Sequence, residues 1–195
     1  LFDHPTIANL ARRIDSVLGM ESKQIEPFNR SAREVIPLSF AQQRLWFLDQ
    51  LEDDLNAYNM PFTWRLRGDL NREALRRALE ELVRRHEPLR TTFELVDEEP
   101  VQRIGEPVAF ELGCDDLSSF DHEQQSDAIE QRLRVEANQP FDLRSDLMVR
   151  SSLLRLADQD HLFLLTVHHI ANDGWSISIL WRELEMYYRA FCMGV

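Results

Sequence analysis

Two adjacent histidines, His168 and His169, follow an apolar run and precede the turn residues Asp173 and Gly174. Imidazole titrates near neutral pH, so a histidine at the end of a strand can accept or donate a proton during a reaction. Such a ring needs an orienting partner, which Asp173 or the backbone of the turn could supply. The stretch therefore suggests general acid/base chemistry at the mouth of a buried strand.

Each of these residues also has a purely structural interpretation. Side chains alternate across a strand, so His168 and His169 should point to opposite sides, which argues against a metal ion held by both. No glutamate or cysteine completes a zinc ligand set, and we expect no bound metal. Asp173 can cap the helix that follows, and Gly174 can occupy a turn position with positive φ. Spacing alone leaves the catalytic and the structural interpretations open.

The composition is that of an ordinary globular protein. The 195 residues are 44% hydrophobic and 29% charged, which is enough apolar material for a core. A net charge of −12 argues against a nucleic-acid partner, because phosphate binding needs clustered Lys and Arg. Cys114 and Cys192 cannot form a disulfide framework, which favours a cytoplasmic location. No apolar run approaches the roughly 18 residues of a membrane span, so no membrane partner is expected.

From residue 36 onward the pattern predicts a mixed α/β fold. Apolar residues at three- and four-residue spacing predict helices, of which 71–86 is the clearest, whereas 123–137 is polar on most sides and should be peripheral. Strands 147–156 and 161–167 should pair across a short turn, and the second should be a central strand buried on both faces. The predicted helices are 39–51 (capped by Ser39), 71–86, 123–137 and 176–191, and the predicted strands are 58–66, 91–96, 101–104, 109–112, 147–156 and 161–167.

The first 35 residues have a different pattern. Apolar residues such as Ile7, Leu10 and Ile14 share one face of a short helix over 1–18, which Gly19 ends. A helix of this length is marginal alone and should dock on a neighbour. Residues 19–35 are polar and without periodicity, which indicates a linker.

Three motifs in order resemble those of nonribosomal peptide synthetase condensation domains, which belong to the chloramphenicol acetyltransferase-like acyltransferases. Residues 168–174 (HHIANDG) match the HHxxxDG signature of that superfamily. Residues 39–48 (SFAQQRLWFL) resemble the first core motif of condensation domains, and residues 85–93 (RHEPLRTTF) resemble the second. In addition, residues 1–11 (LFDHPTIANLA) resemble the last helix of a carrier protein domain.

The resemblance implies a chloramphenicol acetyltransferase-like α/β (α+β sandwich) half, with a mixed, largely antiparallel sheet flanked by helices. Residues 36–195 would be the N-terminal half of a domain whose active site lies at the mouth of a tunnel between two halves. Residues 1–18 would end a carrier domain, and residues 19–35 would be the linker. No cofactor should bind this chain directly, because the 4′-phosphopantetheine arms of upstream and downstream carrier domains deliver the substrates. The other implied partners are the C-terminal half of the condensation domain and an adjacent adenylation domain.

The implied reaction is peptide-bond formation, in which the acceptor's α-amine attacks the donor's thioester. The family pattern assigns catalysis to His169, either as a base or as the group that positions the amine. His168, Asp173 and Gly174 would support the site, Asp173 through a salt bridge to an arginine. A backbone N–H near Gly174 is a candidate donor to the thioester oxygen. A location at a helix end favours structural roles for Arg85, His86 and Arg90, and the same applies to Gln42, Arg44 and Trp46.

Other functions remain open at this point. An epimerisation domain shares the HHxxxDG signature and also follows a carrier, but the AQQRLW run of residues 41–46 fits condensation better. A heterocyclisation domain is disfavoured because it replaces the two histidines with an aspartate motif. A non-catalytic module that only binds carriers is the third alternative, and the intact His169 argues against it. The 195-residue piece alone should be inactive, because half a tunnel leaves the site open to water.

Overall fold

A computed structural model describes residues 6, 8, 36–51 and 56–194 of the chain. The chain divides into two units, Leu1–Glu34 and Val35–Val195, and the account below concerns the second. The predicted helix over 1–18, apart from Thr6 and Ala8, and the predicted linker over 19–35 lie outside the described residues. The proposed domain boundaries therefore stay a prediction.

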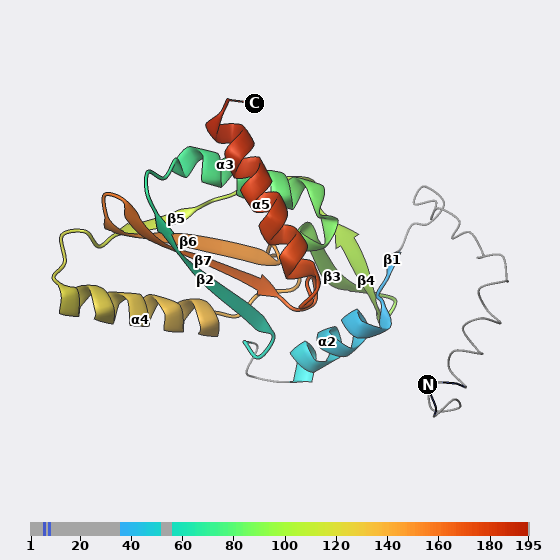
Figure 1. Cartoon of the computed structure of the whole chain (residues 1–195). Coiled ribbons are helices and arrows are strands. Elements are labelled where there is room, and N and C mark those ends of the chain that lie inside the picture. The colour runs from blue at the N-terminus through green and yellow to red at the C-terminus, as the bar shows by residue number, and fades with distance from the viewer. Residues whose placement is uncertain (1–5, 7, 9–35, 52–55, 195) are drawn as a thin grey trace. The chain divides into compact units, whose positions relative to one another are not determined.

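Two sheets form the framework of the second unit (Figure 1). In the four-stranded mixed sheet the strands lie in the order β2 (Asn59–Arg67), β7 (Asp160–His168), β6 (Val149–Ala157) and β5 (Gly113–Asp116). In the three-stranded antiparallel sheet the order is β1 (Ile36–Pro37), β4 (Glu99–Ile104) and β3 (Thr91–Val96). The predicted hairpin of residues 91–96 and 101–104 is thus confirmed as β3 and β4.

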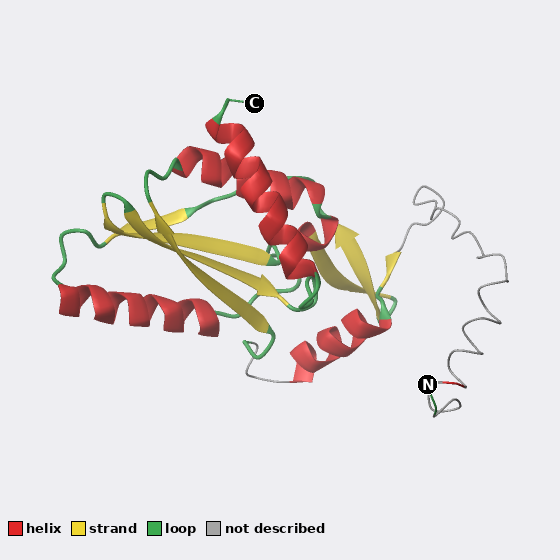
Figure 2. Cartoon of the chain, viewed as in Figure 1, coloured by secondary structure: helices red, strands yellow, loops and turns green. Residues whose placement is uncertain are grey.

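Helices cover both faces of the four-stranded sheet (Figure 2). On one face, α3 and α5 bury Leu79 and Leu180 in the same core cluster as Phe163 of β7. On the other face, Ile129 of α4 packs against a second cluster that contains Leu164 of β7. The helices are α2 (Phe40–Leu51), α3 (Arg72–Arg85), the 3₁₀ helix η2 (Glu87–Arg90), α4 (His122–Asn138) and α5 (Ser176–Cys192).

Strand β7 is the central element and leads directly to the paired histidines. It is antiparallel to both β2 and β6, and its residues from Phe163 to His168 are all buried. The predicted central strand is therefore confirmed. Both neighbours extend past its end, since the His168 N–H donates to the Met148 carbonyl at 3.0 Å and the His169 N–H donates to the Tyr58 carbonyl at 2.9 Å. These two hydrogen bonds fix the backbone positions of both histidines.

The strand predicted over residues 109–112 is wrong. That segment has no strand, and the strand forms instead at Gly113–Asp116, parallel to β6. Phe110 is buried in the core beneath α3 and α5, so its apolar character reflects packing rather than sheet pairing. Gly113 lies against β6, where an added Cβ would come within 3.6 Å of the Ser152 Cβ. The polar sequence Gly-Cys-Asp-Asp conceals this short edge strand from a search for apolar alternation.

Candidate active site

His168 and His169 point to opposite sides of the sheet, as strand alternation predicts. The side chain of His168 is buried, with 1% of the residue exposed, whereas His169 is exposed. His168 lies on the α4 face together with Thr166, because side chains two residues apart share a face. The two rings therefore cannot hold one metal ion between them. Only His169 is open to a substrate.

The buried ring of His168 holds the turn that follows it. Its Nδ1 accepts a hydrogen bond from the Ile170 N–H at 3.2 Å, and the edges of Phe141 and Tyr58 close around it, with ring centroids 5.6 and 6.4 Å away. Burial lowers the pKa of His168 to about 4, and the nearby His169 and Arg150 add to this effect. A neutral ring keeps Nδ1 free of a proton near neutral pH, which preserves the hydrogen bond to Ile170.

His169 has a fixed tautomer. Its Nδ1 lies 2.8 Å from the backbone carbonyl oxygen of Asn172. A carbonyl can only accept, so Nδ1 must carry the hydrogen, and the neutral ring has its lone pair on Nε2. Among the described residues, no protein group hydrogen-bonds this Nε2. The turn thus presents one basic nitrogen of known orientation.

Asp173 closes the turn that leads into α5. Its Oδ1 accepts hydrogen bonds from the Trp175 N–H at 3.1 Å, the Ser176 N–H at 2.8 Å and the Ser176 hydroxyl at 2.6 Å. These bonds, those from Ser176 first, lower the pKa of Asp173. The N-cap position of α5 is Trp175, which forms no side-chain capping hydrogen bond, so Asp173 stabilises the turn that leads into the helix instead of occupying the cap position. No arginine within 36–51 or 56–194 forms an ion pair with Asp173, and the salt bridge implied by the resemblance stays a prediction.

The expectation of a positive φ at Gly174 is wrong. Among the described glycines, positive φ values occur at Gly68 and Gly194. Hydrogen bonds from Trp175 and Ser176 to the side chain of Asp173 hold this turn, so no left-handed residue is needed there. A Cβ added at Gly174 would meet no heavy atom within 4 Å, which leaves open space beside the backbone of the turn. The next residue, Trp175, is 82% exposed at the same rim.

Asn172 contributes to the site in a way that the sequence did not reveal. Besides its backbone bond to His169, its side chain is buried, and its Oδ1 has no hydrogen-bond partner. Its Nδ2 lies 3.9 Å from the Sδ of Met60 in β2. A cavity of about 130 Å³ lies between this turn, η2 and the first turns of α5. In the sequence, Asn172 occupies a variable position of the signature, and nothing there marks its carbonyl as the partner of His169.

Several residues of the first two motifs connect elements around the site. Glu183 of α5 accepts at Oε2 from His86 Nε2 at 2.7 Å and pairs with Arg85 Nε at 3.2 Å, which ties the end of α3 to α5. Arg90 donates to the backbone carbonyl of Gly105. Gln42 and Ser39 form a reciprocal cap at the start of α2. These contacts are those of structural residues.

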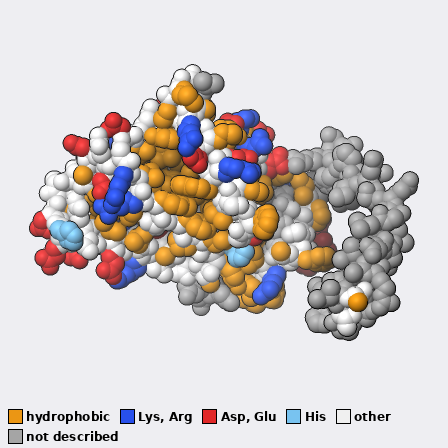
Figure 3. Space-filling view, in the orientation of Figure 1, with side chains coloured by type: hydrophobic (Ala, Val, Ile, Leu, Met, Phe, Trp, Pro, Cys, Tyr) orange, Lys and Arg blue, Asp and Glu red, His pale blue; other side chains and the backbone are white. Residues whose placement is uncertain are grey.

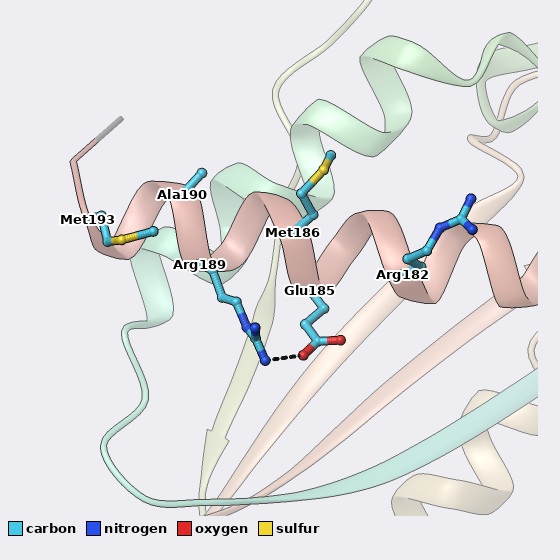
Figure 4. A pocket seen from close by; sticks show the side chains of 6 residues that line it. All are labelled: Arg182, Glu185, Met186, Arg189, Ala190 and Met193. Carbon is cyan, nitrogen blue, oxygen red and sulfur yellow. Dashed lines mark hydrogen bonds and ion pairs between the residues drawn. The ribbon is translucent and has the colours of Figure 1, made fainter.

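A larger hollow lies elsewhere, along the second half of α5. Figure 4 shows its lining residues on α5 and at Met193 just after it, with an ion pair between Arg189 and Glu185. The volume of the hollow is about 430 Å³. Arg182, its first lining residue, is six positions after Ser176, which corresponds to about 9 Å along the helix. No histidine lines this hollow. Among the residues that the structure describes, no group of three His, Cys, Asp or Glu side chains could hold a metal, and no helix is long and apolar enough to cross a membrane.

The second unit is thus an α/β fold in which helices cover both faces of a mixed sheet, and one exposed histidine of fixed tautomer follows the central strand. The chain belongs to the condensation domain family, whose family model matches residues 32–194. The predicted family and the chloramphenicol acetyltransferase-like fold class are thereby confirmed.

Curated relatives are large synthetases. One of the linear gramicidin synthase proteins of Brevibacillus parabrevis is 40% identical over the whole chain, which spans 2% of that protein. Chondramide synthase of Chondromyces crocatus is 48% identical over 81% of the chain, and the match spans 4% of that protein. The chain therefore corresponds to a small part of the proteins it matches.

Solved structures agree with this assignment. The X-domain from teicoplanin biosynthesis aligns with a TM-score of 0.76 and 31% identity, over 87% of this chain and 35% of that one. The starter condensation domain of rhizomide synthetase aligns with a TM-score of 0.75 and 26% identity, over 84% of this chain and 39% of that one. The chain thus spans well under half the length of these solved proteins.

Proposed function

We propose that the protein containing this chain forms peptide bonds between carrier-tethered substrates in nonribosomal peptide synthesis. Family membership and the synthetase relatives support this proposal. The observation that carries it is the 2.8 Å contact between His169 Nδ1 and the Asn172 carbonyl, which leaves Nε2 available to a substrate amine. An amine must lose its proton to complete the attack, and an imidazole can accept that proton or a hydrogen bond from it.

The reaction exchanges one acyl bond for another. The acceptor's nitrogen forms a C–N bond to the donor's thioester carbon, and the C–S bond breaks. The departing thiolate takes up the proton that the amine loses, which gives a free thiol. His169 Nε2 would accept that proton or orient the amine. The backbone N–H near Gly174 would donate to the carbonyl oxygen as negative charge develops, and the open space beside Gly174 supports this role.

The substrates would arrive on the 4′-phosphopantetheine arms of carrier domains upstream and downstream, with an adenylation domain as a further neighbour in the same synthetase. The match to the linear gramicidin synthase protein covers the whole chain, including residues 1–35. This supports the assignment of these residues to the same kind of synthetase. The free Cys114 and Cys192 support a cytoplasmic location.

Helix α2 offers a surface for one of these carriers. Phe40, Phe47 and Leu51 are 91%, 56% and 64% exposed and, with Arg44, fall on one side of the helix at a spacing of three, four and seven residues. The opposite side, which includes Leu45, packs on the core. An exposed apolar stripe with one cation fits an amphipathic partner whose charge is negative.

A charge placed in this stripe should weaken carrier binding. Phe47→Asp should raise the KM for one loaded carrier by roughly tenfold, on the scale of a lost apolar interface contact of about 1.4 kcal/mol, while a single-turnover rate at saturation changes little. The matched control is Phe120→Asp, since Phe120 is an exposed phenylalanine on a different segment. An equal effect of both variants, or none for Phe47→Asp, would rule out α2 as the docking surface.

Epimerisation is the alternative reaction, and isotope labelling separates the two. With donor and acceptor carriers loaded in D₂O, condensation predicts a new dipeptidyl product on the acceptor carrier and no deuterium at the donor's α-carbon. Deuterium uptake without a dipeptidyl product would favour epimerisation. Carrier binding without either change would favour the non-catalytic module.

A further inference from the structure

A buried ionic cluster lies between α4 and the sheet, on the same face as His168. Its centre is Glu136, in the last turn of α4, which is only 4% exposed. Glu136 Oε2 pairs with Arg150 Nε at 3.1 Å, and Oε1 pairs with Arg132 Nη2 at 3.1 Å. The Ser152 hydroxyl also donates to Oε1 at 3.1 Å. A carboxylate is this deeply buried only when charged or hydrogen-bonding partners surround it.

Arg150 is held at several points. Besides the carboxylate of Glu136, its Nη2 donates to the backbone carbonyls of Glu136 at 2.8 Å and Gln139 at 2.6 Å. Its guanidinium carbon lies 4.1 Å from the ring centroid of Phe141, the distance of a cation–π contact. The guanidinium thus links strand β6, the end of α4 and the segment that carries Phe141.

Phe141 brings this cluster into contact with the site. Its ring packs edge-on against His168, with centroids 5.6 Å apart and planes inclined at 68°. Arg150 is paired with Thr166 across β6 and β7, and His168 lies two residues further along on the same face. Glu136, Arg150, Phe141 and His168 therefore form one continuous line of contacts that ends at the turn.

We propose that Arg150 is a positioning residue for His169. Held by Glu136 and stacked on Phe141, it fixes the ring of His168 in the orientation in which Nδ1 accepts the Ile170 N–H. That hydrogen bond shapes the turn whose Asn172 carbonyl orients His169. The proposal rests on the proposed function of His169, whereas the contacts among Glu136, Arg150, Phe141 and His168 do not depend on that function.

The charged groups near His168 affect its pKa according to the sign of their charge, which packing contacts alone would not do. Arg150 and His169 are the charged or titratable groups that act on His168 directly. Glu136, Asp146 and Arg132 in turn act on the guanidinium of Arg150. The guanidinium of Arg150 opposes a proton on His168, and the carboxylate of Glu136, which pairs with that guanidinium, offsets part of its positive charge. Removing one charge or the other should therefore shift the pKa of His168 in opposite directions.

The test is an NMR titration of His168 in the full chain, with the histidines isotopically labelled. Arg150→Met, which keeps the length of the side chain, should raise the pKa of His168, because it removes a cation that opposes protonation of the ring. Arg150→Lys keeps the charge and should leave the titration close to that of the parent chain. Glu136→Gln removes the anion and should not raise the pKa.

Loosened packing alone would raise the pKa in all three variants, since each would admit water to the ring. That result, or an unchanged titration in Arg150→Met, would overturn the proposal. In the intact synthetase, Arg150→Met should also shift the acid limb of the pH–rate profile upward by a similar amount. If His169→Ala retained full activity while the titrations behaved as expected, the proposed function would fail and the positioning network would stand.

Discussion

At the scale of single residues, the two adjacent histidines have different environments and different contacts. His169 is exposed and has its tautomer set by a backbone carbonyl, whereas His168 is buried and holds the turn through Nδ1. The signature alone could not separate these roles, although strand alternation already placed the rings on opposite sides. The tautomer of His169 is fixed by the backbone carbonyl of Asn172. The position of that carbonyl depends on the path of the turn backbone, so the identity of residue 172 does not predict it.

Substitutions at His168 should follow the hydrogen bond to Ile170. Asparagine can place Oδ1 where Nδ1 lies, so His168→Asn should retain most of the condensation rate of the intact synthetase. His168→Leu leaves the Ile170 N–H unpaired in a buried site, at a cost of about 1–3 kcal/mol, and should lose both stability and rate. Equal rates for the two variants, measured in single-turnover assays, would show that the hydrogen bond is unimportant.

Acid should destabilise the fold through His168. Its pKa is about 4 in the folded chain and near 6.5 when unperturbed, so between these values the unfolded chain binds a proton that the folded chain does not. Stability should therefore fall as the pH is lowered from 6.5 to 4, by up to about 3 kcal/mol from this group. Denaturant unfolding at several pH values measures the slope, which should be shallower in His168→Asn. An identical slope in that variant would contradict the assignment.

At the scale of elements, strong periodicity predicted the structure well and weak or polar segments did not. Helix α3 and the β6–β7 pair followed from apolar spacing, and the cap at Ser39 followed from residue type. Strand β5 was missed because its sequence is polar, and the pairing of β1 with β4 was missed because β1 has two residues. The buried Glu136 was missed as well, because α4 reads as a polar, peripheral helix.

The start of α5 depends on Asp173. Its carboxylate accepts three hydrogen bonds from Trp175 and Ser176, where the turn enters the helix, and these bonds lower its pKa. The ionised carboxylate therefore stabilises the fold above pH 3.8, and this contribution is lost as the pH falls through the lowered pKa. Asp173→Ala should lower the thermal unfolding midpoint at pH 7. Asp127→Ala, an exposed aspartate within α4, serves as the control and should leave the midpoint almost unchanged. Matching midpoints for the two variants would show that the hydrogen bonds to Asp173 contribute nothing to stability.

At the scale of the whole molecule, the chain presents apolar surface beyond what an isolated unit needs. Figure 3 shows hydrophobic side chains gathered over the face on which α5 crosses the sheet. A groove of about 430 Å³ there is lined by Leu66, Phe163, Trp181 and Tyr188, among others. Exposed apolar patches of this kind mark interaction surfaces. The solved condensation domain, of which this chain spans 39%, has further chain available to cover it.

The isolated 195-residue chain should therefore be inactive and prone to self-association. Its site faces water on one side, and stabilisation of a developing charge requires a closed, preorganised surround. With both loaded carriers supplied, we expect no dipeptidyl product from this chain. We also expect a sedimentation coefficient that rises with concentration. Product formation, or a single monomeric species at all concentrations, would contradict the respective expectation.

The central claim is that His169 acts directly on the amine, and single-turnover condensation in the intact synthetase tests it most directly. His169→Ala should lower the rate at least about 100-fold, the lower range for loss of a general acid/base group, with both carriers still loaded and bound. His122→Ala, which removes an exposed histidine at the start of α4, should leave the rate unchanged. A His169→Ala rate equal to that of the parent enzyme would contradict the account.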